Sequence, residues 1–306
     1  MKLSIVSTLF LSERSLKEFY ERTKQVAKDF AGDDHEIILV NDGSPDKSLS
    51  LALELVKKDK NLRLIDLSRN FGHYKAMMTG LGYAQGDKIF LLDSDLEEDP
   101  EYLDLFFQKM NKESCDVVFG VQDKRKGKFF ERISGRLFWY IFNFLSGMRL
   151  PINTVTARLM NKSYVDALLK HQEREIFIAG LWHITGFNQM ECTVTKKSIS
   201  KSSYTFFMKL SLLVNAITSF SNAPLRIIFY LGVSILLLSI IYILYLTLMW
   251  AYFLEPPDGW TSVMASIWLL GGLIISFLGV IGIYLSKIYS ETKNRPYTII
   301  KKEYGF

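Results

Sequence analysis

The stretch Leu91–Glu101, which reads LLDSDLEEDPE, determines the fold and carries the first candidate site. The apolar run of residues 88–92 predicts a buried parallel strand, because such strands are apolar on both faces. Five carboxylates follow it: Asp93, Asp95, Glu97, Glu98 and Asp99. If the chain stays extended past Leu92, residues 93, 95 and 97 share one face at the carboxyl end of the strand. Open α/β sheets bind their ligands at that end.

Three carboxylates on one face repel one another unless a cation lies between them. A set of oxygen ligands without sulfur or histidine suits a hard ion. The sequence therefore predicts Mg²⁺ or Mn²⁺ held by Asp93, Asp95 and Glu97. The alternative is an acidic loop that caps the next helix, since Asp99-Pro100-Glu101 is a good helix start.

Strand-like apolar runs alternate with amphipathic helical runs over the first part of the chain. Strands are predicted over residues 3–9, 36–40, 62–67, 87–92 and 117–121, with helices between the first four. A further strand and helix are predicted over residues 153–171. This alternation predicts an α/β domain with a doubly wound, mostly parallel sheet.

Hydrophobic residues make up 49% of the 306 residues, and their excess is local. Residues 227–254 and 259–286 are each 28 residues without a charged side chain. A hydrocarbon core needs about 20 apolar residues, so the sequence predicts two transmembrane helices and a membrane-bound protein. Cys115 and Cys192 have neither metal-ligand spacing nor the pattern of a disulfide framework.

The predicted organisation has three parts. Residues 1–223 form a catalytic domain with interfacial helices near 129–148 and 204–222, residues 224–288 form a transmembrane hairpin, and residues 289–306 form a basic tail. Lys and Arg flank both outer ends of the hairpin and are absent from its connecting loop. The positive-inside rule therefore places the catalytic domain and both termini in the cytoplasm, at the plasma (inner) membrane. The net charge of +5 fits an anionic membrane face and substrate, and no nucleic-acid motif is present.

Further motifs occur in a fixed order along the chain. They are NDGS at 41–44, RNFG at 69–72, the acidic stretch, GLW at 180–182, ITSFS at 217–221 and KNRPY at 293–297. Together they resemble family-2 glycosyltransferases, and especially the membrane-anchored members that load a sugar onto a polyprenyl phosphate. The resemblance covers nearly the whole chain.

This resemblance implies a GT-A fold and an inverting transfer from a nucleotide-sugar, for which UDP is the expected nucleotide. Asp42 and main-chain groups near Ser7 and Leu9 would contact the nucleoside. Asp93 and Asp95, with Glu97 as a third ligand, would hold the divalent ion on the diphosphate. The implied role of the product is cell-surface glycan synthesis or modification.

A phosphate acceptor carries about −1.5 to −2 charges at pH 7, so it needs cations rather than a general base. The candidate cations are Arg125, Arg132, Arg136, Lys197 and Lys201, of which Arg125 and Arg132 are expected closest to the chemistry. Anchoring to lipid headgroups is the alternative role for each of them.

Departures from the family pattern keep other hypotheses open. Many members carry Asp-Phe-Arg-Leu where this chain has Thr156-Ala157-Arg158-Leu159. If the acceptor were a hydroxyl of a lipid-linked glycan, Glu173 or Glu175 could act as its base. A non-catalytic membrane scaffold is a third hypothesis. His73 and His183 are interpreted as loop and packing residues, and sugar translocation by two helices would need a partner or a homo-oligomer.

Overall fold

The computed structural model describes residues 2–122, 140–148, 150–151, 153–197, 206–253 and 259–306. The chain divides into two compact units. The first comprises residues 1–139, 149–206 and 295–306, and the second comprises residues 140–148 and 207–294. This division differs from the predicted boundaries, because residues 140–148 and 207–222 group with the hairpin and the end of the tail groups with the sheet.

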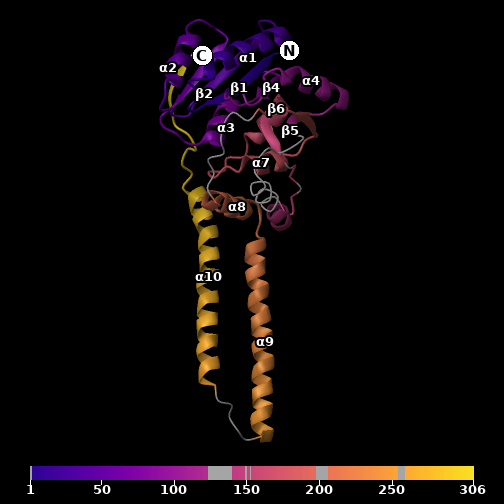
Figure 1. Ribbon diagram of the computed structural model, residues 1–306, viewed down its shortest axis with the longest axis vertical. Coiled ribbons are helices and arrows are strands. Elements are labelled where there is room, and N and C mark those ends of the chain that lie inside the picture. The colour runs from indigo at the N-terminus through magenta and orange to yellow at the C-terminus, as the bar shows by residue number, and fades with distance from the viewer. Residues whose placement is uncertain (1, 123–139, 149, 152, 198–205, 254–258) are drawn as a thin grey trace. The chain divides into compact units, whose positions relative to one another are not determined.

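The first unit is a sheet covered by helices, as Figure 1 shows. Its strands are β1 (Leu3–Leu9), β2 (His35–Asn41), β3 (Leu62–Leu67), β4 (Lys88–Leu91), β5 (Val117–Gln122), β6 (Thr154–Asn161), β7 (Gln189–Val194) and β8 (Ile300–Tyr304). Its helices are α1 (Leu16–Ala31), α2 (Ser48–Val56), α3 (His73–Tyr83), α4 (Tyr102–Glu113), α6 (Lys162–Leu168) and α7 (Ile178–Ile184).

The eight strands form one sheet in the order β7-β5-β6-β4-β1-β2-β3-β8. Strands β4, β1, β2 and β3 are parallel to their neighbours in this group, whereas β6 and β8 are antiparallel additions on either side. The predicted mostly parallel, GT-A-like α/β fold is confirmed.

The strand order reverses between β1 and β4. The chain moves outward from β1 through β2 to β3 and then returns, by α3, to place β4 on the other side of β1. Helices α1 and α2 pack on one face of the sheet with α4, and α3 packs on the opposite face. A crevice at the carboxyl ends of β1 and β4 is therefore the expected ligand site of this topology.

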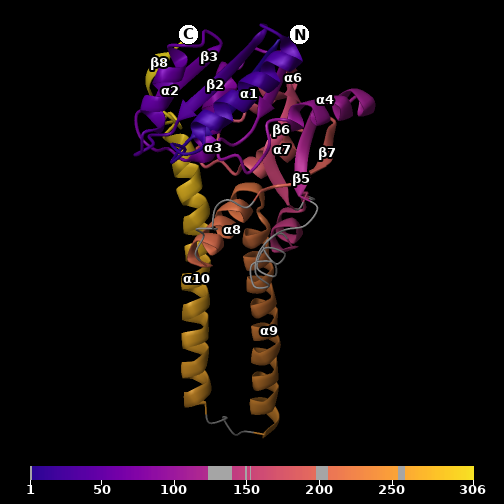
Figure 2. The ribbon, with the colours of Figure 1, turned by 45° about the horizontal axis from the view of Figure 1, so that its top comes forward.

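Strand β8 comes from the last residues of the chain and completes the edge of the sheet next to β3 (Figure 2). Thr298 Oγ1 lies 2.8 Å from Thr79 Oγ1 on α3, and the Tyr83 hydroxyl donates to the carboxylate of Glu303. The sequence of this segment predicted only a basic tail. Because this strand is rich in charged residues and pairs with β3, more than two hundred residues earlier in the chain, it has no recognisable strand pattern in the sequence.

Close packing of α3 on the sheet depends on a glycine. A Cβ atom added to Gly80 would lie 2.6 Å from Val6 Cγ1 and 2.8 Å from Val40 Cγ2. Carbon atoms that are not bonded cannot approach so closely. The observed short separation between α3 and strands β1 and β2 therefore requires glycine at position 80.

We expect Gly80→Val to lower the free energy of unfolding by about 1–3 kcal/mol, because the added atoms overpack the α3–sheet interface. The matched control is Gly82→Val on the same helix, where an added Cβ would meet no atom within 4 Å. Thermal unfolding of the two detergent-purified variants would make the comparison. Equal melting temperatures would contradict the packing argument.

The second unit contains α8 (Phe206–Phe220), α9 (Ala223–Phe253) and α10 (Trp260–Thr292), together with a helical turn over residues 140–146. Helices α9 and α10 run side by side in both Figure 1 and Figure 2. Each contains a segment long and apolar enough to cross a membrane, over Ala223–Tyr242 and Leu269–Thr292. The predicted apolar hairpin is thus confirmed as two long helices.

Candidate active site

The acidic stretch turns immediately after β4. The strand ends at Leu91, Leu96 has a left-handed backbone with φ 60°, and the Glu97 amide donates to Asp95 Oδ1 at 2.9 Å. An aspartate that bonds the amide two residues ahead stabilises a turn in competition with extended backbone. The prediction that Asp93, Asp95 and Glu97 share one extended face is therefore wrong.

Asp93 lies at the switch point between β4 and β1. Its Oδ2 accepts a hydrogen bond from the hydroxyl of Thr156 at 2.8 Å, and its Oδ1 lies 3.2 Å from Nε2 of His73. The other ring nitrogen of His73 lies 3.0 Å from the hydroxyl oxygen of Thr8 on β1. The arrangement joins β1, the start of α3, the acidic turn and β6 around one carboxylate.

Burial disfavours the charge on both Asp93 and His73, but their mutual attraction outweighs it. The pKa of Asp93 consequently lies below its ordinary value, and the pKa of His73 lies above its own. Burial and the neighbouring Asp93 carboxylate raise the pKa of Asp95. The site therefore keeps a buried anion at Asp93 and disfavours a second one beside it.

Glu97 and Glu98 both form ion pairs with Lys196, a residue that was not among the predicted site residues. Lys196 Nζ lies 3.2 Å from Glu97 Oε2 and 3.4 Å from Glu98 Oε1. Glu98 is fully buried and also accepts the main-chain amides of Thr156 and Ala157 at 3.1 and 2.6 Å. Burial and Asp93 raise the pKa of Glu98, whereas Glu98 and Asp93 raise the pKa of Lys196 against the effect of its burial.

Asp42 follows β2 and organises the loop before α3. Its two carboxylate oxygens accept the amides of Phe71 and Gly72 at 2.7 and 3.0 Å, and it is only 2% exposed. Burial raises its pKa, although the two amide donors oppose that shift. Gly43 has φ 58° and lies directly under this loop, since an added Cβ would be 2.5 Å from main-chain atoms of Arg69 and Asn70. The NDGS and RNFG motifs therefore contact each other, through the Asp42 hydrogen bonds and the close approach of Gly43 to the loop.

The predicted nucleoside contacts on β1 lie at the correct edge of the sheet but are buried. Ser7 and Leu9 are both 0% exposed, and the main-chain carbonyl of Leu9 accepts the Asp42 amide at 3.0 Å. The Ser7 hydroxyl has no hydrogen-bond partner among the described residues. The exposed residues nearest to them in sequence are Phe10 and Leu11.

Of the predicted acceptor-binding cations, the structure describes only Lys197. Its Nζ pairs with Asp99 at 2.6 Å, and Arg22 pairs with the same carboxylate. Lys197 is thus half-exposed and engaged in a surface ion pair. Arg125, Arg132, Arg136 and Lys201 lie outside the described residues.

Glu173 and Glu175, the alternative bases, lie in the irregular segment between α6 and α7. His183, interpreted from the sequence as a loop or packing residue, is an exposed residue near the end of α7. His73, by contrast, was interpreted as a loop residue because the sequence offered no second ligand at a useful spacing. Its partners Thr8 and Asp93 lie on other elements, so spacing along the chain could not have identified them.

The donor set that remains for a metal ion is smaller than predicted. Across the described part of the chain, no three His, Cys, Asp or Glu side chains gather as ligands. Oδ1 of Asp93 lies 3.2 Å from Nε2 of His73, a contact that still leaves this oxygen a lone pair for a metal ion, and Asp95 follows two residues later. Mg²⁺ is commonly held by one or two carboxylates plus substrate phosphates, so these residues fit such an ion.

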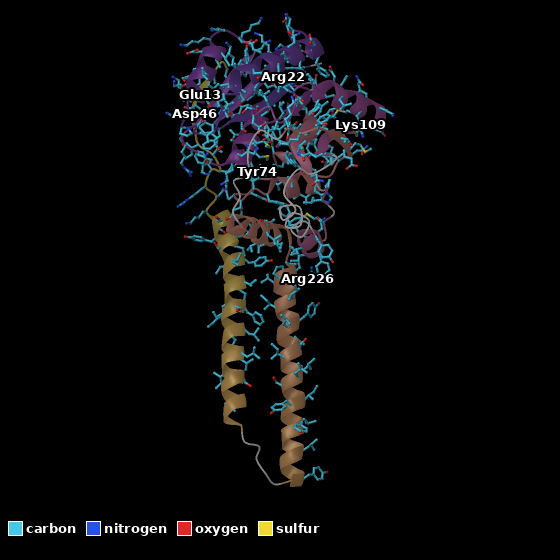
Figure 3. The ribbon with its side chains drawn as sticks, in the orientation of Figure 1. Glu13, Arg22, Asp46, Tyr74, Lys109 and Arg226 are labelled. Carbon is cyan, nitrogen blue, oxygen red and sulfur yellow. The ribbon has the colours of Figure 1, made fainter. Side chains whose placement is uncertain are left out.

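We expect His73→Gln to lower kcat by about 10- to 100-fold, because the variant loses the charged partner that orients Asp93. The control is Tyr74→Phe, which changes the next, partly exposed side chain (labelled in Figure 3) and leaves the pair intact. Initial rates at saturating donor would distinguish the two variants. A His73→Gln enzyme with wild-type kcat would remove His73 from the site.

The mostly parallel sheet, with acidic and basic side chains clustered at its switch point, places the first unit in the GT-A-like class of α/β folds. Residues 4–169 match the family described as glycosyl transferase family 2, and the chain belongs to that family. It is a family-2 glycosyltransferase.

Relatives match over nearly their whole length. A Mycobacterium tuberculosis protein, provisionally named as a glycosyltransferase, is 48% identical over 100% of this chain and 89% of its own. An uncharacterised glycosyltransferase of Bacillus subtilis is 33% identical over 100% of this chain and 95% of its own. A prophage-derived bactoprenol glucosyl transferase of Shigella flexneri is 29% identical over 99% of both chains.

Proposed function

We propose that this enzyme transfers a sugar from a nucleotide-sugar, with UDP as the expected nucleotide, to a polyprenyl phosphate at the cytoplasmic face of a membrane. The observation that carries the proposal is the pair of the partly buried Asp93 with the half-exposed His73 at the switch point, in a chain that also has two apolar helices of membrane-spanning length. The similarity to a bactoprenol glucosyl transferase over almost the whole chain supports a polyprenyl acceptor.

The residues of the site suit the donor half of this reaction. Asp93 and Asp95 would hold a Mg²⁺ or Mn²⁺ ion, which as a Lewis acid neutralises the charge of the departing nucleoside diphosphate. Asp42 holds the Arg69–His73 loop against the end of β2, and Gly43 lets the two segments approach closely. His73 keeps Asp93 ionised and oriented.

The acceptor half needs little proton transfer, because a phosphate oxygen is already ionised at neutral pH. His73 contacts Asp93 at 3.2 Å, and we assign it the role of positioning that carboxylate rather than that of a general base. Cations that position the acceptor remain a prediction, with Arg125, Arg132, Arg136 and Lys201 as the candidates. Cell-surface glycan synthesis or modification is the role that we propose for the product.

The test uses full-length protein in detergent, Mg²⁺ or Mn²⁺, and a panel of radiolabelled nucleotide-sugars with undecaprenyl phosphate as the acceptor. We expect label to enter the organic phase in a metal-dependent manner and to stay in the aqueous phase with Asp95→Ala. Transfer of label only to a lipid-linked glycan would instead favour a hydroxyl acceptor, with Glu173→Gln and Glu175→Gln as the next variants. Absence of transfer from every donor, with nucleotide binding intact, would refute the proposal.

A further inference from the structure

A pocket in the second unit lies at the turn between α8 and α9, beside α10. Its volume is about 440 Å³. The residues that line it are Ser146, Thr218, Ser219, Phe220, Ser221, Asn222, Arg226 and Tyr284. All of them belong to the same compact unit, so the pocket is formed within one body of the chain.

Hydrogen bonds to main-chain carbonyls fix the wall of this pocket. The Ser221 hydroxyl donates to the carbonyl of Leu145, and the Tyr284 hydroxyl donates to the carbonyl of Ser221 at 2.5 Å. The Nζ atom of Lys287 donates to the Ser219 hydroxyl at 2.6 Å. These bonds link residues 140–146, the α8–α9 turn and α10, so the cavity is preformed rather than a gap between loose helices.

The charge of the pocket is positive. No carboxylate lines it, whereas Arg226 does, and Lys287 is bonded to its wall. Across the described ranges the Arg226 guanidinium has no ion-pair partner, and Figure 3 shows this residue at the α8 end of α9. Arginine offers five donors in a planar array that suits phosphate oxygens, and the Asn222 amide adds two more.

A second, largely apolar cavity adjoins the first. It has a volume of about 320 Å³ and shares Ser146 and Arg226 with the polar pocket. Its other lining residues are Phe144, Leu145, Gly147, Ala223, Ile227 and Tyr230. A polar cavity and an apolar cavity that meet at one arginine suit a ligand with an anionic head and a hydrocarbon chain.

The pocket also lies at the end of the two apolar helices where a membrane lipid would present its headgroup. The first apolar segment begins at Ala223 and the second ends at Thr292, so both segments have this end in common. If the hairpin spans a membrane as proposed, lipid headgroups lie at this end.

We propose that this pocket binds the phosphate head of a polyprenyl phosphate, with the first prenyl units in the adjoining apolar cavity. The inference rests on the proposed function for the identity of the lipid. A phosphomonoester presents three terminal oxygens and about −1.5 to −2 charges to Arg226 and Asn222. One prenyl chain is the tail that a cavity of about 320 Å³ beside the polar pocket would receive, whereas a phospholipid has a diester head and two chains.

The experiment measures binding of undecaprenyl phosphate to the full chain in detergent by native mass spectrometry, without any nucleotide-sugar. Arg226→Gln removes the cation, and Asn222→Asp places a carboxylate in the pocket at an exposed position. The matched control is Lys293→Gln, which removes one positive charge near the end of α10 from a residue outside the pocket. Phosphatidylglycerol and undecaprenol serve as comparison ligands.

Loss of a charge-assisted hydrogen bond to the phosphate predicts roughly tenfold weaker binding of undecaprenyl phosphate by Arg226→Gln and by Asn222→Asp. Lys293→Gln should bind as the wild type does, and undecaprenol should bind weakly to every variant. Unchanged binding by both pocket variants would overturn the proposal. An equal loss of phosphatidylglycerol binding would also overturn it, by assigning the pocket to a structural lipid.

The binding readout separates this inference from the proposed function. Binding of undecaprenyl phosphate that depends on Arg226, without sugar transfer from any donor, would leave the pocket assignment standing and refute the reaction. Sugar transfer to undecaprenyl phosphate, together with wild-type binding by both pocket variants, would support the proposed reaction and refute the pocket assignment.

Discussion

An Asp93→Asn variant is expected to transfer sugar about a thousandfold more slowly than the wild-type chain. The substitution keeps the size of the side chain and an oxygen that can accept the Thr156 hydroxyl. It removes the negative charge that pairs with His73 and that would hold the metal ion. Preorganised charge at a reacting diphosphate contributes about 10²–10³-fold for a single group, and here one carboxylate has two roles.

Stability should respond quite differently to this substitution. Loss of the His73 pair destabilises the site, but loss of the Asp93 charge also relieves the repulsion that raises the pKa of Glu98. We therefore expect a melting temperature close to that of the wild type. Asp99→Asn is the control, because Asp99 belongs to the same acidic stretch but pairs with Arg22 and Lys197. Equal rates for the two variants would remove Asp93 from the reaction.

The second large effect concerns folding, and it is expected at Glu98. Glu98→Ala leaves two main-chain amides without their buried acceptor and leaves Lys196 paired with Glu97 but not with Glu98, so the free energy of unfolding should fall by about 3–5 kcal/mol. Glu98→Gln keeps one acceptor oxygen and should lose about 1–3 kcal/mol. Chemical denaturation of the detergent-purified variants measures both values.

A surface carboxylate from the same region provides the comparison for Glu98. Glu101 is half-exposed and pairs with Arg22, so Glu101→Ala should cost only about 0–1 kcal/mol. A Glu98→Ala variant as stable as Glu101→Ala would show that the two amides find other acceptors. The order alanine below glutamine below wild type at position 98 is the pattern that burial and hydrogen bonding require.

The sequence identified much of the fold because its signals were local. Apolar strands, amphipathic helices and two long uncharged runs each occur within one continuous segment, so periodicity and length located them. β8 was missed because a short, charged strand on the sheet edge has little apolar pattern of its own. Its place depends on pairing with β3, which no local signal encodes.

The sequence indicated at which end of the sheet the candidate residues lie but not which contacts they make. The acidic stretch and the NDGS motif lie at strand ends, and topology alone brings those ends together. The shared extended face of Asp93, Asp95 and Glu97 was wrongly inferred from strand geometry, since the Asp95 side chain accepts a hydrogen bond from the Glu97 amide in a turn of the chain. His73, Glu98 and Lys196 acquire their roles through contacts with residues on other elements, so sequence spacing gives no indication of them.

The position of β8 has a consequence for biosynthesis. The strand that covers β3 lies after the second apolar helix, at residues 300–304 of 306. A ribosome therefore releases both apolar helices before the sheet can be completed, and β3 keeps an unpaired edge during that interval. Unpaired edges favour pairing between chains. Chains from which residues 300–304 are removed should therefore leave the edge of β3 open to pairing with other chains and should aggregate more readily.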